Sequence, residues 1–412
     1  MSLPEVSISQ SHHNDAALVE QACPGSVSEV LTPDRCALAR DTISRWSSYQ
    51  PTVLHSLEGL TGEIGIGSLY YKDESTRFGL GSFKALGGAY AVQHVLRQAL
   101  DANVPDANVS LDDINAQRFA EMVEKITVVT ATDGNHGRSV AWGAQRFGCQ
   151  CMIYMHENVS QARQEAVEAF GANVVRVAGN YDDSVRQADH DAKANDWHIV
   201  SDTSYPGYME IPREVMAGYT LMTTEAMDQL PEGVIPTHVF IQGGCGGLAG
   251  AVAADLWYRY GDKMPHLIVV EPVPAACLYE SARAGEPQLV NIVDESLMAG
   301  LSCGEVSLLG WQILRPSARH FLTISDAPVA PLMKLLAAGV SGDSVIVAGE
   351  SAIAGLAGLI GAMGNKQLAR EIGLNNKSRV LVFGTEGATD PEVFEALVGT
   401  RAENIVAQSS SS

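Results

Sequence analysis

Short apolar runs alternate with amphipathic segments in the middle of the chain, between residues 126 and 200. The apolar runs predict strands, and the segments between them place apolar residues at helical spacing. The expected strands cover residues 126–130, 151–155, 173–177 and 197–200, and the expected helices cover 137–147, 160–170 and 181–195. Apolar strands separated by helices are typical of right-handed parallel βαβ units. We therefore expect a small α/β domain here.

The same alternation returns further along the chain, after a long helix predicted over residues 214–229. Strands are expected at 237–241, 267–271, 344–347 and 379–383, with a helix at 248–260. The pattern indicates a second open parallel sheet and no repeat of fixed period. The predicted fold class is α/β, with two open, mainly parallel sheets in two lobes. Residues 1–88 and 226–412 are assigned to a large domain, and residues 89–225 to a small one.

Composition limits the partners that this fold could bind. Hydrophobic residues make up 46% of the chain, charged residues only 18%, and the formal net charge is −21. Nucleic acids and anionic membrane surfaces are bound mainly through Lys and Arg, so we expect neither as a partner. No segment has the roughly 18 uncharged apolar residues that a membrane-spanning helix needs. The Ala- and Gly-rich stretch 351–364 is too short and predicts a buried helix.

The start of the chain lacks the basic and apolar regions of a secretory signal, and the seven cysteines are irregularly spaced. We therefore expect a cytoplasmic protein without a disulfide framework. Cys277 and Cys303 flank a loop-rich stretch, 279–302, that could cover a cleft. Free thiols are expected at both positions, with a redox-sensitive pair as the alternative.

A glycine loop, Gly243-Gly244-Cys245-Gly246-Gly247, lies between a predicted strand and a predicted helix. Glycines let successive backbone N–H groups converge, and a helix N-terminus adds partial positive charge, so this loop is a candidate phosphate cradle. It lacks the Gly-Lys-Ser/Thr ending of a nucleotide P-loop and the spacing of the dinucleotide fingerprint. A single small phosphate fits it better, and a tight packing turn is the alternative.

A second strand-to-helix junction carries Asp133, Asn135 and His136. Asp133 can take a proton, and the Asn135 amide can donate to an oxyanion. The alternative for both is turn and capping chemistry. For His136, a buried hydrogen bond to the backbone competes with a chemical role.

Lys84 stands between Phe83 and Ala85 and is followed by Gly87-Gly88. An ammonium group among apolar and small residues is costly to desolvate, and a lysine in such a setting can form a Schiff base. The alternative is a surface lysine whose stem covers apolar neighbours.

Two further side chains follow predicted strands. The hydroxyl of Thr385 could bond a heterocycle nitrogen, or belong to a plain turn. Asp202 leaves the last strand of the small domain, and helix capping is its alternative role.

In this order, these motifs resemble the fold type II pyridoxal-phosphate enzymes, the group of tryptophan synthase β and threonine dehydratase. Within that group, the chain is most similar to the diaminopropionate ammonia-lyase family. The resemblance spans about residues 70 to 390 and rests on Lys72-Asp73-Glu74, Arg77-Phe78-Gly79, Ala131-Thr132-Asp133-Gly134-Asn135-His136-Gly137, Asn180-Tyr181-Asp182-Asp183, Ser201-Asp202-Thr203, Met298-Ala299-Gly300-Leu301-Ser302-Cys303-Gly304-Glu305 and Thr385-Glu386-Gly387-Ala388-Thr389-Asp390.

The resemblance implies that pyridoxal 5'-phosphate lies in the cleft between the lobes, with Lys84 forming the internal aldimine beside Phe83. It also implies that Asn135 bonds the ring oxygen, that residues 243–247 hold the phosphate, and that Thr385 faces the pyridine nitrogen. The carboxylate of Asp133 replaces the small residue of ordinary serine or threonine dehydratases, and Asp202 matches the second acid of the lyases. A homodimer is carried over in the same way, and no metal is expected.

The activity so implied is α,β-elimination of 2,3-diaminopropionate, as the D- or L-isomer or both, to pyruvate and ammonia. Asp133 or Lys84 would take the Cα proton, an aminoacrylate would follow, and Asp202 would be a possible second acid. One alternative is a dehydratase or β-lyase of the same group that acts on serine, threonine, 3-hydroxyaspartate or another β-substituted alanine. Others are a nucleotide- or sugar-phosphate-binding protein without pyridoxal chemistry, and a non-catalytic relative.

Overall fold

The computed structural model describes residues 3–18, 21–132 and 134–409. Its internal contacts divide the chain into two compact units. We call Met1–Thr32, Pro51–Ser82 and Met222–Ser412 the large unit, and Pro33–Gln50 with Phe83–Leu221 the small unit. We propose domain limits at residues 89 and 225, a few residues from the unit boundaries after Ser82 and Leu221.

The large unit is built on a seven-stranded sheet with the order β1-β10-β9-β8-β11-β3-β2. Its inner pairs are parallel, and the edge strands β1 and β2 pair antiparallel with their neighbours. The strands are β1 (Ile8–His13), β2 (Leu54–Ser56), β3 (Ser68–Asp73), β8 (His238–Gln242), β9 (His266–Pro272), β10 (Ala318–Ile324) and β11 (Arg379–Gly384). The expected second sheet, mainly parallel, is therefore confirmed.

One expected strand of this sheet is wrong. Residues 344–347 form no strand, and the amide of Ile346 donates instead to Leu336 O at the end of a helix. The place in the sheet beside β9 belongs to β10, which the sequence did not reveal because Arg319 and His320 interrupt its apolar run.

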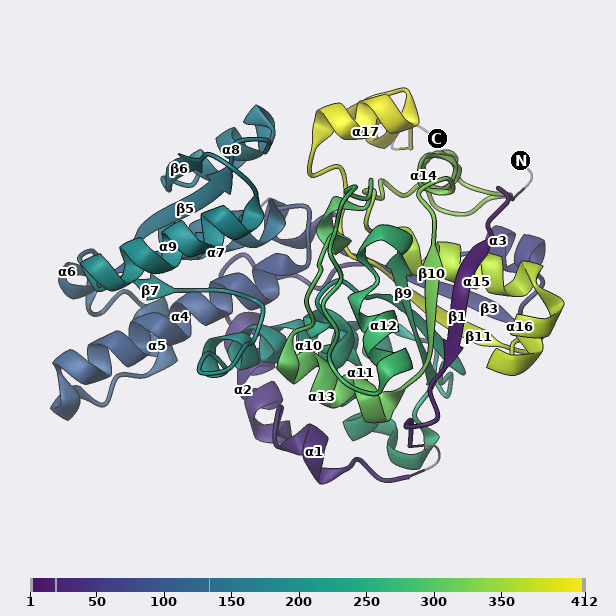
Figure 1. The fold of residues 1–412 in the computed structure, drawn as a ribbon, viewed down its shortest axis with the longest axis horizontal. Coiled ribbons are helices and arrows are strands. Elements are labelled where there is room, and N and C mark those ends of the chain that lie inside the picture. Colours follow the sequence, from purple (N-terminus) through teal and green to yellow (C-terminus); the bar gives the residue numbers. More distant parts are fainter. Residues whose placement is uncertain (1–2, 19–20, 133, 410–412) are drawn as a thin grey trace. The chain divides into compact units, whose positions relative to one another are not determined.

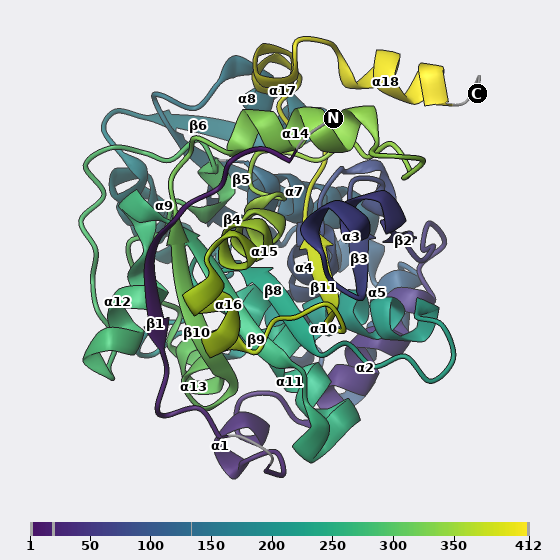
Figure 2. The same cartoon turned by 90° about the vertical axis from the view of Figure 1, so that its right-hand side faces the viewer.

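Helices cover both faces of this sheet, and Figure 2 shows α15 (Ala354–Gly364) in front of β8, β9 and β11. The expected buried helix in the Ala- and Gly-rich stretch is thus confirmed. The other α-helices of the unit are α1 (Gly25–Ser28), α3 (Glu58–Ile64), α11 (Gly247–Tyr260), α12 (Cys277–Ala284), α13 (Leu308–Ser317), α14 (Val329–Ala338), α16 (Lys366–Ile372), α17 (Pro391–Val398) and α18 (Ala402–Ser409). Short 3-10 turns include η1 (Arg77–Gly79).

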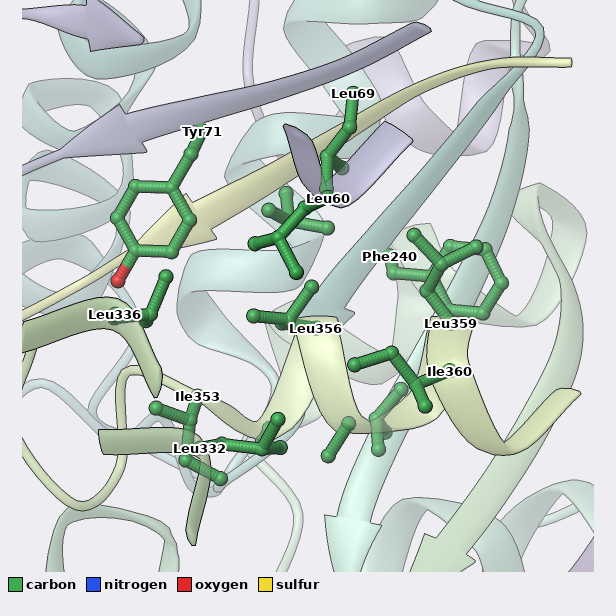
Figure 3. Packing of buried hydrophobic residues seen from close by; sticks show 14 of the residues in the cluster. Leu60, Leu69, Tyr71, Phe240, Leu332, Leu336, Ile353, Leu356, Leu359 and Ile360 are labelled. Carbon is green, nitrogen blue, oxygen red and sulfur yellow. The ribbon is translucent and has the colours of Figure 1, made fainter. Parts of the chain in front are cut away.

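Close packing of small residues holds α15 against the sheet. A Cβ on Gly355 would lie 2.8 Å from Phe240 O, and one on Gly358 would lie 2.5 Å from Val270 Cγ2, so the helix approaches the strands as closely as glycine allows. Its larger residues, among them Leu356 and Ile360, join the buried core around Phe240 (Figure 3).

The small unit contains a four-stranded parallel sheet with the order β6-β5-β4-β7, and all four expected strands are confirmed. They are β4 (Thr127–Ala131), β5 (Gln150–His156), β6 (Asn173–Val177) and β7 (His198–Ile199). The helices, several of which Figure 1 labels, are α2 (Pro33–Ser44), α4 (Lys84–Asn103), α5 (Leu111–Asn115), α6 (Ala120–Val123), α7 (Asn135–Phe147), α8 (Gln161–Glu168) and α9 (Tyr181–Asn195), and α10 (Glu210–Gln229) runs from this unit into the large one. None of the helices in the described ranges is long and apolar enough to cross a bilayer.

A buried charge cluster, formed by Thr52, Lys72, Glu74, Arg77 and Glu225, ties several segments of the large unit together. Lys72 Nζ lies 2.7 Å from Glu225 Oε2, which Arg77 Nη2 also approaches at 2.7 Å. Arg77 Nε lies 2.8 Å from Glu74 Oε2. The Thr52 hydroxyl donates to Glu74 Oε1 at 2.6 Å. The charges of the two cations and the two carboxylates cancel, and this compensation allows the four side chains to be buried.

Replacing Arg77 by methionine should destabilise the large unit strongly. The Arg77→Met variant leaves two carboxylates with one cation in a buried place, and breaking such a pair costs about 3–5 kcal/mol. Urea titration followed by circular dichroism measures the loss in the free energy of unfolding. Arg401→Met, which removes an exposed ion pair with Glu395, is the control and should change stability little. Equal stability of the two variants would contradict the structural role of the cluster.

Candidate active site

Lys84 is the first residue of α4, and its side chain is held by a carboxylate. The ammonium nitrogen lies 2.5 Å from Asp202 Oδ2, and only 22% of the lysine side chain is exposed. It also lies 5.4 Å from the centre of the Phe83 ring, which packs against Tyr219 at 4.7 Å between ring centres. A paired amine over an aromatic ring is held in one place, as a lysine with a covalent role requires.

Asp202 follows β7, and its side chain is 17% exposed. Burial opposes ionisation of this carboxyl, but the charge of Lys84 and its hydrogen bond outweigh the burial and hold the pKa of Asp202 well below its usual range. Asp202 is therefore an ionised carboxylate that fixes the position of the lysine amine.

His136 lies behind this pair. Its Nε2 is 2.8 Å from the carbonyl oxygen of Val200, and because a carbonyl can only accept, Nε2 carries the proton. Its Nδ1 is 3.8 Å from Asp202 Oδ2 and has no hydrogen-bond partner among the described residues. Burial lowers the pKa of His136. The backbone hydrogen bond considered from the sequence is thus present, and the imidazole is neutral, so the cation beside Asp202 is Lys84.

Gly87 and Gly88 explain how α4 can pack so closely behind Lys84. A Cβ on Gly88 would lie 1.9 Å from the Ser139 hydroxyl of α7, and one on Gly87 would lie 2.5 Å from the Tyr219 ring of α10. The glycine pair therefore lets α4 approach both helices, and it fixes the helix that begins with the lysine.

Asp133 lies outside the described residues, whereas Asn135 is the first residue of α7. Thr132 shapes the junction between β4 and this helix, because its hydroxyl accepts from the amides of Gly134 and Gly137, both at 3.1 Å. A Cβ on Gly137 would lie 2.1 Å from Thr132 Cγ2, which explains the glycine there.

The glycine loop joins β8 to α11 in the large unit, where it forms a turn that few other sequences could adopt. Gly244 and Gly246 have φ of 59° and 95°, in the left-handed region. Gly246 is the N-cap residue of α11, and no side chain caps the amides of the first helical turn. A helix N-terminus of this kind is suited to hold a phosphate.

Glu271, at the end of β9, lies beneath this loop and was missed from the sequence. A Cβ on Gly243 would lie 2.4 Å from Glu271 Cγ, so only glycine fits there. The Glu271 carboxyl accepts from the amides of Leu278 and Tyr279, at 2.9 and 2.7 Å, and burial raises its pKa to about 8. It thereby anchors α12 beside the loop.

Thr385 follows β11, the strand next to β8 in the sheet, so it stands at the same sheet edge as the glycine loop. Gln242, the last residue of β8, donates to the Thr385 hydroxyl at 3.1 Å. Ser82, two residues before Lys84, pairs with Glu386 as an isolated bridge. Gln242 directly precedes the glycine loop, but the sequence gave no sign of its contact with Thr385.

The structure thus gathers the predicted site residues into two groups. Within the small unit, Phe83, Lys84 and Asp202 lie together, with His136 behind them. Within the large unit, residues 243–247 and Thr385 share one edge of the sheet. Of the described residues, no group of three or more His, Cys, Asp or Glu side chains is placed to hold a metal ion. Neither Cys277 nor Cys303 takes part in a disulfide within the described ranges.

A family model described as "Pyridoxal-phosphate dependent enzyme" matches residues 46–386. The chain belongs to this family. It is 37% identical over 382 residues to diaminopropionate ammonia-lyase of Escherichia coli (strain K12), which covers 91% of this chain and 94% of that protein. A crystal structure of the Escherichia coli enzyme "in complex with aminoacrylate-PLP azomethine reaction intermediate" is 35% identical, with a TM-score of 0.84 and coverage of 96% of this chain and 98% of that one. A probable D-serine dehydratase of Colwellia psychrerythraea is 26% identical over 337 residues, 79% of this chain and 75% of that protein.

The expectation of a pyridoxal-phosphate enzyme is therefore confirmed, and the side chains present fit that cofactor. Lys84 offers a fixed amine for covalent attachment, and the uncapped first turn of α11 offers amides for a phosphate. Thr385 would offer a hydroxyl to the ring nitrogen, and Asn135 an amide to the ring oxygen.

Replacing Gly246 by alanine should weaken retention of pyridoxal phosphate. A left-handed conformation costs an L-residue roughly 1–2 kcal/mol. The new Cβ would also lie only 3.0 Å from Leu278 Cδ2 and 3.2 Å from Leu314 Cδ1. We expect Gly246→Ala to lose cofactor on dialysis, measured as visible absorbance per protein. Gly62→Ala, whose Cβ would meet no atom within 4 Å, is the control and should keep the cofactor. Full retention by both variants would contradict the assignment of the loop.

Proposed function

We propose that this chain eliminates ammonia from 2,3-diaminopropionate, so that the substrate and one water yield pyruvate and two molecules of ammonia. The observation that carries this proposal is the 37% identity to diaminopropionate ammonia-lyase over almost the whole of both chains. The pairing of Lys84 with Asp202 supports it, because both match acid–base residues that the family resemblance assigns to this reaction.

The bound cofactor supplies the electron sink for loss of the Cα proton, and the chain's own residues supply proton transfer and orientation. Lys84 would hold the cofactor and, once displaced by the substrate amine, is an amine that can take the Cα proton. Asp202 would keep that amine in place through the ion pair at Oδ2. Asp133 is proposed as the second base, because a carboxylate can attract a β-ammonium group and handle its proton.

A dehydratase acting on serine is the second candidate, favoured by the 26% identity to a probable D-serine dehydratase. Asp133 separates the two candidates chemically. A departing β-amine must receive a proton, and its positive charge is attracted by a carboxylate, whereas the neutral hydroxyl of serine gains less from one.

Pyruvate release decides between these substrates. We expect kcat/KM for D- or L-2,3-diaminopropionate to exceed that for D- and L-serine, in a coupled assay with lactate dehydrogenase. Lys84→Ala should abolish release and also remove the visible absorbance of lysine-bound cofactor. A preference for serine would contradict the proposed substrate, and a borohydride-reducible band in Lys84→Ala would contradict the proposed lysine.

Asp133→Asn should affect the two isomers of 2,3-diaminopropionate unequally. If Asp133 and Lys84 each take the Cα proton of one isomer, loss of the Asp133 base lowers kcat for only one of them. We expect a loss of about 10²-fold or more for that isomer, which is typical of a missing general base. Steady-state pyruvate release with each pure isomer measures this. An equal loss for both would rule out two separate bases.

We further infer a cytoplasmic homodimer. The dimer is carried over from the family resemblance, and the location is inferred from the irregular spacing of the cysteines.

A further inference from the structure

The side-chain amide of Gln242 has an orientation that its surroundings determine. Its Nε2 lies 2.7 Å from the carbonyl oxygen of Phe383 and 3.1 Å from that of Ala352, and the residue is 1% exposed. Carbonyl oxygens only accept hydrogen bonds, so the amide nitrogen, not the amide oxygen, must face them. The two backbone carbonyls therefore fix which end of Gln242 points toward Thr385.

That end is a donor. Nε2 also lies 3.1 Å from Thr385 Oγ1, so its two protons serve three acceptors and one proton is shared between two of them. Since an amide nitrogen has no lone pair to offer, the threonine hydroxyl can only accept there. The proton of that hydroxyl is then left for another acceptor, and no described residue supplies one. Thr385 is 3% exposed, and a buried polar group without its partner costs about 1–3 kcal/mol. The hydroxyl is thus set to donate to something that the chain itself does not provide.

We propose that Gln242 is a positioning residue that holds Thr385 as a hydrogen-bond donor to the ring nitrogen of pyridoxal phosphate. This inference rests on the proposed function. A nitrogen that accepts a hydrogen bond keeps its lone pair and stays unprotonated, so it withdraws electrons weakly. Such a ring favours prompt loss of the β-substituent over long storage of the carbanion charge.

A glutamine-to-glutamate change tests the direction of this hydrogen bond almost without change of shape. Between two carbonyl oxygens in a buried place, the new carboxyl of Gln242→Glu stays protonated and donates its only proton to one of them. The oxygen facing Thr385 can then only accept. The threonine hydroxyl then donates its proton to that carboxyl oxygen. A lone pair of Oγ1 is left facing the ring nitrogen, and only a protonated ring nitrogen can donate a hydrogen bond to it.

The experiment is ¹⁵N NMR of holoenzyme loaded with ring-¹⁵N pyridoxal phosphate, without substrate. Wild type should give the resonance of an unprotonated, hydrogen-bonded nitrogen. Gln242→Glu should move it far upfield, as protonation does. Gln242→Met, which removes the donor without supplying an acceptor, should move it slightly downfield.

Two controls separate positioning from general disturbance. Gln93 is also a buried glutamine, and its amide donates to Leu111 O at 2.7 Å in the small unit, so Gln93→Met should leave the resonance unchanged. In a Thr385→Val background, Gln242→Glu should cause no further shift, because its effect passes through the hydroxyl.

The proposal is overturned if Gln242→Glu and wild type share one resonance, if the shift persists with Thr385→Val, or if Gln93→Met produces it too. If one of these results is obtained while wild type releases pyruvate from 2,3-diaminopropionate, only the proposed role of Gln242 is contradicted, and the proposed function stands. A wild-type protein that retains no cofactor would overturn this inference together with the proposed function.

Discussion

Parallel pairing of the inner strands decides where functional side chains can stand in each unit. Neighbouring parallel strands end at the same edge of a sheet, and ligands of open α/β sheets bind at that edge. In the large unit, the glycine loop follows β8, Glu271 ends β9 and Thr385 follows β11. In the small unit, the junction around Asn135 follows β4, and Asp202 follows its neighbour β7. Residues far apart in the sequence are thus brought to one edge before any side chain makes a specific contact.

Both units stabilise buried charge by local compensation, although the chain as a whole carries a formal charge of −21. The charge cluster around Arg77 contains equal numbers of cations and carboxylates, and Lys84 faces a single ionised Asp202. His136 adds no charge to that pair, because its tautomer is set by the Val200 carbonyl. The net negative charge of the chain is therefore compatible with buried groups of charges that are each neutral in sum.

The strands that the sequence predicted well include β5 and β8, which have continuous apolar runs between their polar ends, because burial on both faces favours apolar side chains there. Edge strand β1 has polar residues on its outer positions, and β10 carries Arg319 and His320, so neither stood out. The mainly apolar residues 344–347 lie beside the end of α14, where the amide of Ile346 donates to Leu336 O, and they pair with no strand. Among the candidate site residues, Lys84 and the glycine loop stand out in the sequence because their neighbours along the chain indicate their chemistry. Gln242 did not stand out, because its proposed role depends on a contact with Thr385, some 140 positions away in the sequence.

The charge cluster of Thr52, Lys72, Glu74, Arg77 and Glu225 also constrains how the chain can change over evolutionary time. Losing one charge leaves another unpaired and buried, whereas exchanging the whole set for well-packed apolar residues can be neutral or even stabilising. The intermediate sequences are the costly ones. Drift at these positions is therefore expected to be concerted, with the four charges inherited as a block or absent as a block, and with Lys72 varying together with Glu225 even though 153 positions separate them.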